Sequence, residues 1–463
     1  MLFKIAARNI LRNRRRSAVT ASAVAVGALA MLLFGAFQSF VFRGFQTNVV
    51  QHVGHLTVFR DGFFLFGSGN PAEWGIDDHV RVMRLIAEDP VIKPLLAVIT
   101  PQQQLFGIAS YTTHDSSAAK TFLGVGVVPS DRDRMRAWNP YHVPRAFARS
   151  PPLRDDAPER GVVGVGLARI LGACGVPGLP DCPATRPRKP ATDAPDAPAD
   201  LTALAAEATE GAPAATGRRI DLLAATASGA PNVVSLEVVG TEVQGAKEMD
   251  DVYVGMNLLL AQQLVYGRGE HKVTGIVLQL HQTEDMPVVR ARLLELFKQN
   301  NLPLEVRDFI ELTPFYGQTL NFFNALFLFV AIIMGVIVLF TVVNTMTMAV
   351  VERTVEIGTT RALGLRRGAV RRQFVLEGCF LGVLGASAGI VLARGVVFLV
   401  NAAELQWTPP GNAAAVPFRL ASAGTGGLAL TIWLALVLIA TLAALFPANR
   451  AARLQVVDAL RHV

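Results

Sequence analysis

The chain has 463 residues, which is room for a membrane part and a sizeable soluble domain. Hydrophobic residues make up 51% of it, charged residues only 17%, and the mean hydropathy is +0.39, a composition that excludes an ordinary soluble enzyme. The net charge of +7 does not indicate nucleic-acid binding, because the basic residues cluster beside apolar runs and are not interleaved with aromatic side chains.

The chain begins with a basic, amphipathic stretch, residues 1–17, which predicts a cytoplasmic helix in the membrane interface. A cleaved signal peptide also begins with positive charge, but the apolar run that follows is too long for a signal sequence. We therefore expect residues 18–42 to be a retained first transmembrane helix whose N-terminus lies in the cytoplasm.

Residues 43–318 contain no apolar run long enough to cross a bilayer, so we expect a large α+β domain outside the cytoplasm. A strand–helix–strand pattern occurs twice, near the two ends of this segment. Two such halves can pair into a ferredoxin-like unit. The six predicted elements are residues 52–60, 77–89, 94–110, 272–280, 283–300 and 302–312.

A β-rich insert at about residues 129–256 separates the two halves, and its residues 161–168 read as a strand turning into a short helix. Residues 183–217 are rich in Pro, Ala, Asp and Thr, a composition that buries too little apolar surface to fold, so we expect a disordered loop there. A disulfide between Cys174 and Cys182 is expected if this segment lies outside the cytoplasm. Two unpaired thiols in a loop are the alternative.

Three further apolar runs follow, each long enough to cross a bilayer. The first of them is expected to begin as a stalk before it enters the membrane. Together with the helix predicted at 18–42, these three runs predict four transmembrane helices with both chain ends in the cytoplasm. The predicted segments are a stalk and second helix at 319–350, a cytoplasmic loop at 351–373, a third helix at 374–401, an outer loop at 402–423, a fourth helix at 424–446 and a cytoplasmic tail at 447–463.

The third predicted helix carries two pairs of glycines, each pair spaced four residues apart: Gly378 with Gly382, and Gly385 with Gly389. Small residues one turn apart permit close contact between transmembrane helices. The pattern leaves open whether the contacting helix belongs to the same chain or to a second copy.

The loop at 351–373 is charged, and its arginines outnumber Glu352 and Glu356, which places it in the cytoplasm. Residues 355–363 can form a short helix, with Gly364 suited to the left-handed conformation just past its end. Such a helix on the membrane surface fits a groove on a soluble partner. The alternative is a solvated, basic loop that only sets the topology.

The sequence Glu-Arg-Thr-Val-Glu-Ile-Gly at 352–358, followed by Arg-Ala-Leu-Gly at 361–364, resembles the signature of FtsX/MacB/LolCE-type ABC transporter permeases. The chain ending, residues 447–461, also resembles the family, with Val456 where the family usually has Pro. The resemblance implies that the loop is a coupling helix that docks on a separate ATPase subunit. The residues implied to couple are Glu352, Arg353, Glu356, Ile357, Gly358, Arg361, Ala362, Leu363 and Gly364.

The resemblance further implies a non-catalytic permease of the bacterial inner membrane that pairs with a second copy or a related permease. ATP and magnesium would be bound by the partner ATPase, and no cofactor or metal by this chain. The sequence contains no Walker A loop and no nucleophile elbow. His52 and His55 lack the Glu-x-x-His continuation of a zinc motif, so a structural role is expected for them.

The large outer segment would then be a periplasmic porter-like unit with a β-rich subdomain, able to meet a periplasmic or outer-membrane partner. The expected function is export or release of a lipoprotein or a small hydrophobic molecule, driven by the ATPase. Two alternatives stay open: an FtsX-like regulator of a periplasmic enzyme, and a non-transporting membrane receptor or scaffold.

Overall fold

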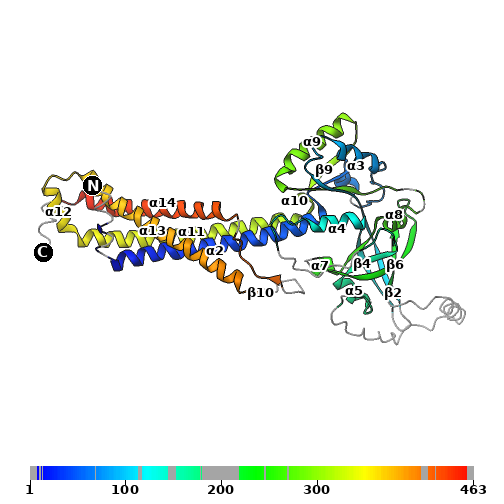
Figure 1. Ribbon diagram of the computed structural model, residues 1–463, viewed down its shortest axis with the longest axis horizontal. Helices are drawn as coiled ribbons and strands as arrows, with labels where there is room; N and C mark the ends of the chain where they lie inside the picture. The colour runs from blue at the N-terminus through cyan, green and yellow to red at the C-terminus, as the bar shows by residue number, and fades with distance from the viewer. Residues whose placement is uncertain are drawn as a thin grey trace. The chain divides into compact units, whose positions relative to one another are not determined.

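The computed structural model describes residues 8–9, 12, 14–67, 69–112, 117–143, 153–177, 179, 218–244, 247–267, 269, 271–407, 416–422 and 424–455. The chain divides into two compact units. Unit 1 comprises Met1–Gly44, Phe315–Trp407 and Pro417–Val463, and unit 2 comprises Phe45–Pro314 and Thr408–Val416. Figure 1 shows long helices in unit 1 and a sheet with accompanying helices in unit 2.

Among the described residues, four helices are long and apolar enough to cross a membrane, the number that the sequence predicted. They are α2 (Arg14–Val53), α11 (Pro314–Glu352), α13 (Arg367–Ala402) and α14 (Gly426–Arg453). Each helix continues beyond its predicted span into polar flanking sequence, because helix formation does not stop where the apolar run stops. The shorter elements of this region are α12 (Thr354–Ala362), β10 (Gln406–Trp407) and β11 (Val416–Pro417).

The helices of unit 1 share one apolar core with polar contacts embedded in it. Gln38 Nε2 donates to Asn324 Oδ1 at 2.7 Å, and Thr20 Oγ1 donates to Thr345 Oγ1 at 2.8 Å, so two hydrogen bonds join α2 to α11. Such pairs hold apolar helices together in lipid, where an unpaired polar group is costly. The core contains Val24 and Ala28 of α2, Val338 and Val342 of α11, Leu381 and Ala386 of α13, and Leu436 and Ala440 of α14.

The four predicted packing glycines of α13 lie against neighbouring helices of the same chain, and they therefore serve close packing within unit 1. A Cβ built at Gly378 would lie 2.4 Å from the Cβ of Ala444, and one built at Gly389 would lie 2.3 Å from the carbonyl oxygen of Ala25. The nearest neighbours are Ala444 for Gly378, Ala440 for Gly382, Val24 for Gly385 and Ala25 for Gly389.

Gly389→Ala is therefore expected to destabilise unit 1 by about 1–3 kcal/mol, because the added methyl group meets backbone of α2 and the two helices must separate. Thermal unfolding of the purified chain in detergent measures the effect. Gly395→Ala is the matched control on the same helix, since no atom lies within 4 Å of its built Cβ. The control should stabilise by up to about 1 kcal/mol through helix propensity, and an equal gain for Gly389→Ala would contradict the packing.

In the described part of unit 2, nine strands form one sheet in the order β3-β7-β4-β6-β5-β2-β8-β1-β9. A further pairing of β3 with β2 closes six of them, β2-β3-β7-β4-β6-β5, into a ring. Strand β2 has 17 residues, long enough to pair both within the ring and with β8. The strands are β1 (Leu56–Arg60), β2 (Leu96–Thr112), β3 (Ser117–Val127), β4 (Arg160–Gly164), β5 (Arg219–Ala225), β6 (Pro231–Glu242), β7 (Tyr253–Asn257), β8 (Gly275–Leu280) and β9 (Leu304–Asp308).

Helices complete the two larger apolar cores in the described part of unit 2. One core lies among the ring strands with α5 and α8, and alternate residues of β5 such as Ile220 and Leu222 point into it. The other lies among β1, β8 and β9 with α3 and α9, and contains Ile86 and Leu293. The helices are α3 (His79–Glu88), α4 (Pro129–Ala137), α5 (Val165–Leu171), α7 (Lys247–Asp250), α8 (Leu258–Tyr266), α9 (Met286–Gln299) and α10 (Phe309–Leu312), with a π-helix at Phe63–Gly67 and a 3-10 helix at Thr283–Asp285.

Two predicted elements differ from the structure by the most at their ends. The first strand begins only at Leu56, because α2 continues to Val53 and ends at Gly54, whose φ of 76° is left-handed. The segment predicted as extended over 302–312 ends in α10, since Asp308 Oδ1 accepts from the backbone N–H of Ile310 and Glu311 at 3.0 and 2.8 Å.

Two predictions about the insert fall largely outside the described residues. The loop predicted at 183–217 lies outside them entirely. Cys174 is disulfide-bonded in the structure, but its predicted partner Cys182 is not among the described residues, so that pairing stays a prediction.

Candidate coupling site

The predicted cytoplasmic loop contains a short helix at nearly the predicted place. Helix α11 ends at Glu352, Arg353 interrupts the helix with a φ of −103°, and α12 then runs from Thr354 to Ala362. Gly364 has a φ of 98°, the left-handed conformation that the sequence predicted just past the helix end. The loop therefore contains a separate short helix of nine residues between two long apolar helices.

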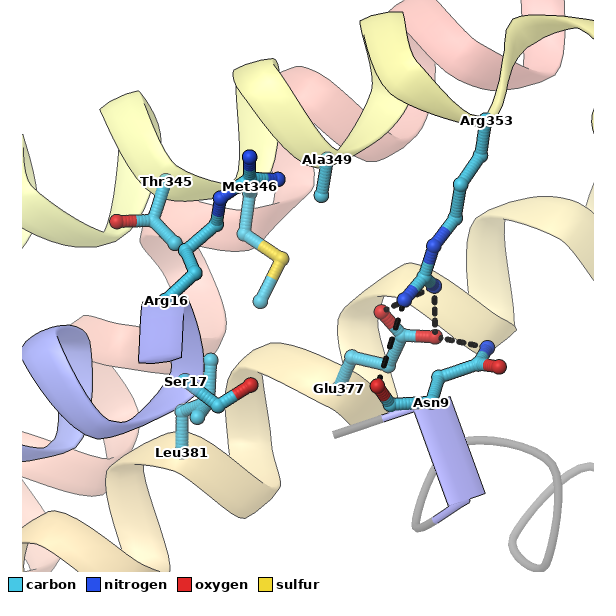
Figure 2. A pocket seen from close by; sticks show the side chains of 9 residues that line it. All are labelled: Asn9, Arg16, Ser17, Thr345, Met346, Ala349, Arg353, Glu377 and Leu381. Carbon is cyan, nitrogen blue, oxygen red and sulfur yellow. Dashed lines mark hydrogen bonds and ion pairs between the residues drawn. The ribbon is translucent and has the colours of Figure 1, made fainter. Parts of the chain in front are cut away.

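Arg353 lies inside unit 1 and not on its surface. The residue is 6% exposed, and its Nη1 lies 3.1 and 3.2 Å from the two carboxylate oxygens of Glu377 on α13. Asn9 Nδ2 donates to Glu377 Oε1 at 2.6 Å, and Arg353 Nη2 donates to the carbonyl oxygen of Asn9 at 3.5 Å (Figure 2). Arg353 was predicted to contact the ATPase, whereas its buried side chain bonds α13 and the N-terminal segment.

A small cavity lies beside this ion pair (Figure 2). Its volume of about 20 Å³ has room for roughly one water molecule, so it is too small to bind a transported molecule. The residues that line it are Asn9, Arg16, Ser17, Thr345, Met346, Ala349, Arg353, Glu377 and Leu381.

Three further contacts attach α12 and its flanks to the helices around it. Arg12 Nη2 lies 2.7 and 2.9 Å from the two carboxylate oxygens of Glu356, and Arg16 pairs with Glu352. Arg361 donates to the carbonyl oxygen of Leu454, just past α14. With the Arg353–Glu377 pair, side chains thus connect the α12 region to the N-terminal segment, α13 and the end of α14.

The outer face of α12 is exposed and carries two large apolar side chains. Val355 and Leu363, which directly follows the helix end, are 46% and 83% exposed, with Thr359 between them and Glu356 and Thr360 exposed beside them. The opposite face, at Ile357 and Gly358, is buried against the core of unit 1. The predicted coupling residues therefore separate into an exposed group (Glu352, Glu356, Ala362, Leu363 and Gly364), a buried group (Arg353, Ile357 and Gly358) and the half-buried Arg361.

Unit 2 contains a buried charged cluster around Glu242, which the sequence did not predict. Glu242 Oε1 lies 2.6 Å from Arg136 Nη2, 3.3 Å from His52 Nε2 and 3.9 Å from Arg132 Nη2. Burial acts to raise the pKa of Glu242, but the hydrogen bond with His52 and the two arginine charges outweigh it and hold that pKa far below its ordinary value. Burial and the Glu242 charge raise the pKa of the neighbouring Tyr253 to about 12.

His55 has a structural role, as the sequence predicted. The backbone N–H of Leu280 donates to His55 Nδ1 at 2.9 Å, so the ring is neutral and its Nε2 carries the proton toward Thr283 Oγ1 at 3.1 Å. Burial lowers the pKa of His55 to about 4.

Comparison with known proteins places the loop in a known context. The family described as FtsX-like permease C-terminal matches residues 327–456, which include α12. The ABC transporter permease YtrF of Bacillus subtilis (strain 168) is 36% identical over 138 residues, 28% of this chain and 30% of the relative. The macrolide export ATP-binding/permease protein MacB of Syntrophobacter fumaroxidans is 31% identical over 157 residues, 34% of this chain and 20% of the relative.

The third relative covers more of both chains. The lipoprotein-releasing system transmembrane protein LolC of Neisseria meningitidis serogroup B is 25% identical over 240 residues, 50% of this chain and 56% of the relative. The chain therefore spans well under two thirds of the length of each of these relatives. With four helices able to cross a membrane among its described residues and a C-terminal part that matches the FtsX-like family, this chain is similar to FtsX, MacB and LolC-like ABC transporter permeases.

Proposed function

We propose that this chain is the membrane subunit of a bacterial inner-membrane ABC transporter and that α12 is its coupling helix. In this proposal a separate ATPase subunit binds ATP and magnesium and docks on α12 in the cytoplasm. The arginine excess around α12 supports a cytoplasmic position for the loop, and with it for both chain ends. Unit 2 then lies outside, in the periplasm.

The observation that carries the proposal is that the α12 region exposes apolar side chains on one side and is bonded to neighbouring helices on the other. Val355 and Leu363 offer a partner an apolar surface, while Arg353 and Arg361 bond the same short segment to α13 and to the end of α14. A protein that binds this face and displaces α12 therefore also displaces the helices that are bonded to α12. That is the two-sided connection that coupling requires.

The part of unit 2 formed by β9-β1-β8-β2 supports a porter-like role. All three pairings in this order are antiparallel, and α3 and α9 each connect two of the four strands. We infer that it is the ferredoxin-like unit and that the six-stranded ring, which shares β2 with it, contains the β-rich insert. Relatives whose names describe lipoprotein release and macrolide export favour a lipoprotein or a small hydrophobic molecule as the substrate, moved by a pair of permease chains.

Leu363→Asp tests the docking face directly. A charge at the centre of an apolar interface is expected to weaken binding of the partner ATPase subunit at least tenfold, since central apolar contacts cost about 2 kcal/mol or more when removed. Titration of the purified ATPase onto the full chain in nanodiscs measures the affinity. Leu405→Asp is the matched control, because Leu405 is also exposed but follows the opposite end of α13. Equal affinities for both variants would remove α12 as the docking surface.

A further inference from the structure

The N-terminal segment bonds to both sides of the junction at which α12 begins. Arg12 pairs with Glu356 inside α12, 344 residues away in sequence, and Arg16 pairs with Glu352 at the end of α11, 336 residues away. Asn9 bonds Glu377, 368 residues away, and the backbone of Asn9 accepts from Arg353. These contacts use both of the acidic residues, Glu352 and Glu356, that the family resemblance assigns to ATPase coupling.

We propose that Asn9, Arg12 and Arg16 form an N-terminal latch that positions α12 for docking and ties its movement to α2. The inference rests on the proposed function in that α12 is taken as the docking helix. The latch makes Glu352 and Glu356 positioning residues that act through arginines of their own chain. The surface left for the ATPase is then the apolar face at Val355 and Leu363.

The geometry of the junction gives the latch its importance. Arg353, with a φ of −103°, departs from helical geometry between α11 and α12, although its backbone N–H still donates to the carbonyl oxygen of Ala349 at 3.3 Å. The backbone therefore restrains the orientation of α12 only in part, and side-chain contacts add to that restraint. Those of Arg12 and Glu356 contribute from the edge of α12, next to its exposed face.

The latch residues contact one buried ion pair and form one exposed ion pair, and these two pairs differ in strength. Arg353 and Glu377 are both buried and hydrogen-bonded, so this pair resists salt and solvent. The side chains of Arg12 and Glu356 are 54% and 57% exposed, so their pair is weak and screened by salt. A docking partner can therefore open the outer pair while the inner pair holds.

Hydrogen exchange of the full chain in nanodiscs, without any ATPase, tests the latch itself. Arg12→Glu and Glu356→Arg are each expected to speed exchange of the α12 amides about two- to fivefold, the size expected for an exposed pair. The swapped variant, carrying both changes, restores an ion pair of opposite direction and should return exchange to within about twofold of the original. In the unmodified chain, raising NaCl from about 0.05 to about 0.5 M should also speed exchange, because salt screens exposed pairs.

Arg15→Glu is the matched control, because Arg15 is exposed, lies between the latch residues and has no ion pair among the described residues. The latch is overturned if Arg12→Glu changes α12 exchange no more than Arg15→Glu does, or if the swapped variant stays as fast as the single variants. If salt leaves α12 exchange in the unmodified chain unchanged, that also overturns it, and this measurement does not depend on any variant folding.

The same variants separate a failed latch from a failed docking proposal. If α12 exchange responds as expected but Leu363→Asp leaves ATPase binding unchanged, the latch stands and the docking surface is wrong. If Leu363→Asp abolishes binding while Arg12→Glu leaves both exchange and binding unchanged, docking stands and the latch is wrong. If both proposals are correct, the swapped variant binds the ATPase with the same affinity as the unmodified chain, because the ATPase does not recognise the charge of residue 356.

Discussion

Replacing Glu377 with Ala is expected to lower the free energy of unfolding of unit 1 by about 3–5 kcal/mol, because it leaves the guanidinium of Arg353 buried without its counter-charge. The loss exceeds the value of the ion pair itself, since the remaining charge keeps its full desolvation cost. Asn9 would also lose its carboxylate acceptor. Exchange of the α12 amides should then rise far more than in the latch variants.

Unfolding of the full chain in mixed detergent micelles, followed by tryptophan fluorescence, measures this loss. The control is the double variant Arg353→Met with Glu377→Met, in which two apolar side chains replace the buried charges. This variant should recover most of the stability, because exchanging a buried pair for apolar groups is often neutral. A double variant less stable than Glu377→Ala would show that the charges are needed for a reason other than mutual compensation.

The buried position of Arg353 shows what a motif does and does not reveal. The pattern Glu-Arg-Thr-Val-Glu-Ile-Gly predicted a short helix and its left-handed end, because capping and glycine preferences are local. The pattern did not show which side chains face outward. Arg353 faces Glu377 because α11 and α13 bring them together, and that is a tertiary fact with no signal in the local sequence.

The same contrast holds in unit 2. Strand–helix–strand halves could be predicted from alternating and helical periodicity, and the structure contains both as β1-α3-β2 and β8-α9-β9. Closure of the six-stranded ring could not be predicted from the sequence, because it depends on β2 pairing with both β3 and β5. Strand pairing over long sequence distances is set by packing and not by residue preference.

Glu242→Gln is the second substitution for which we expect a large loss of stability. It would leave the nearby charges of Arg132 and Arg136 without their carboxylate. We expect a loss of about 3–5 kcal/mol in the stability of unit 2. Arg132 Nη1 also donates to the backbone carbonyl of His52 at 2.8 Å, in the last turn of α2. Displacement of the arginines would therefore loosen the attachment of α4 to that turn.

Glu237→Gln is the matched control, because Glu237 lies on the same strand, β6, in a more exposed pair with Arg160 at 3.5 Å. An exposed pair contributes less than about 1 kcal/mol, so the control should unfold almost as the unmodified chain does. Equal losses for the two variants, measured by thermal unfolding of the full chain at neutral pH, would show that burial of Glu242 does not amplify its charge interactions.

The pH dependence gives an independent measurement of the same cluster. The folded-state pKa of Glu242 lies below that of the unfolded chain, so the folded state holds fewer protons at this site in the interval between the two values. The stability it supplies is thus fully present above the ordinary carboxyl pKa of about 4.3 and is lost as the pH falls below it. Glu242→Gln should flatten this acid-side decline, while Glu237→Gln keeps it. An unchanged decline in Glu242→Gln would mean that other carboxylates cause the acid sensitivity of unit 2.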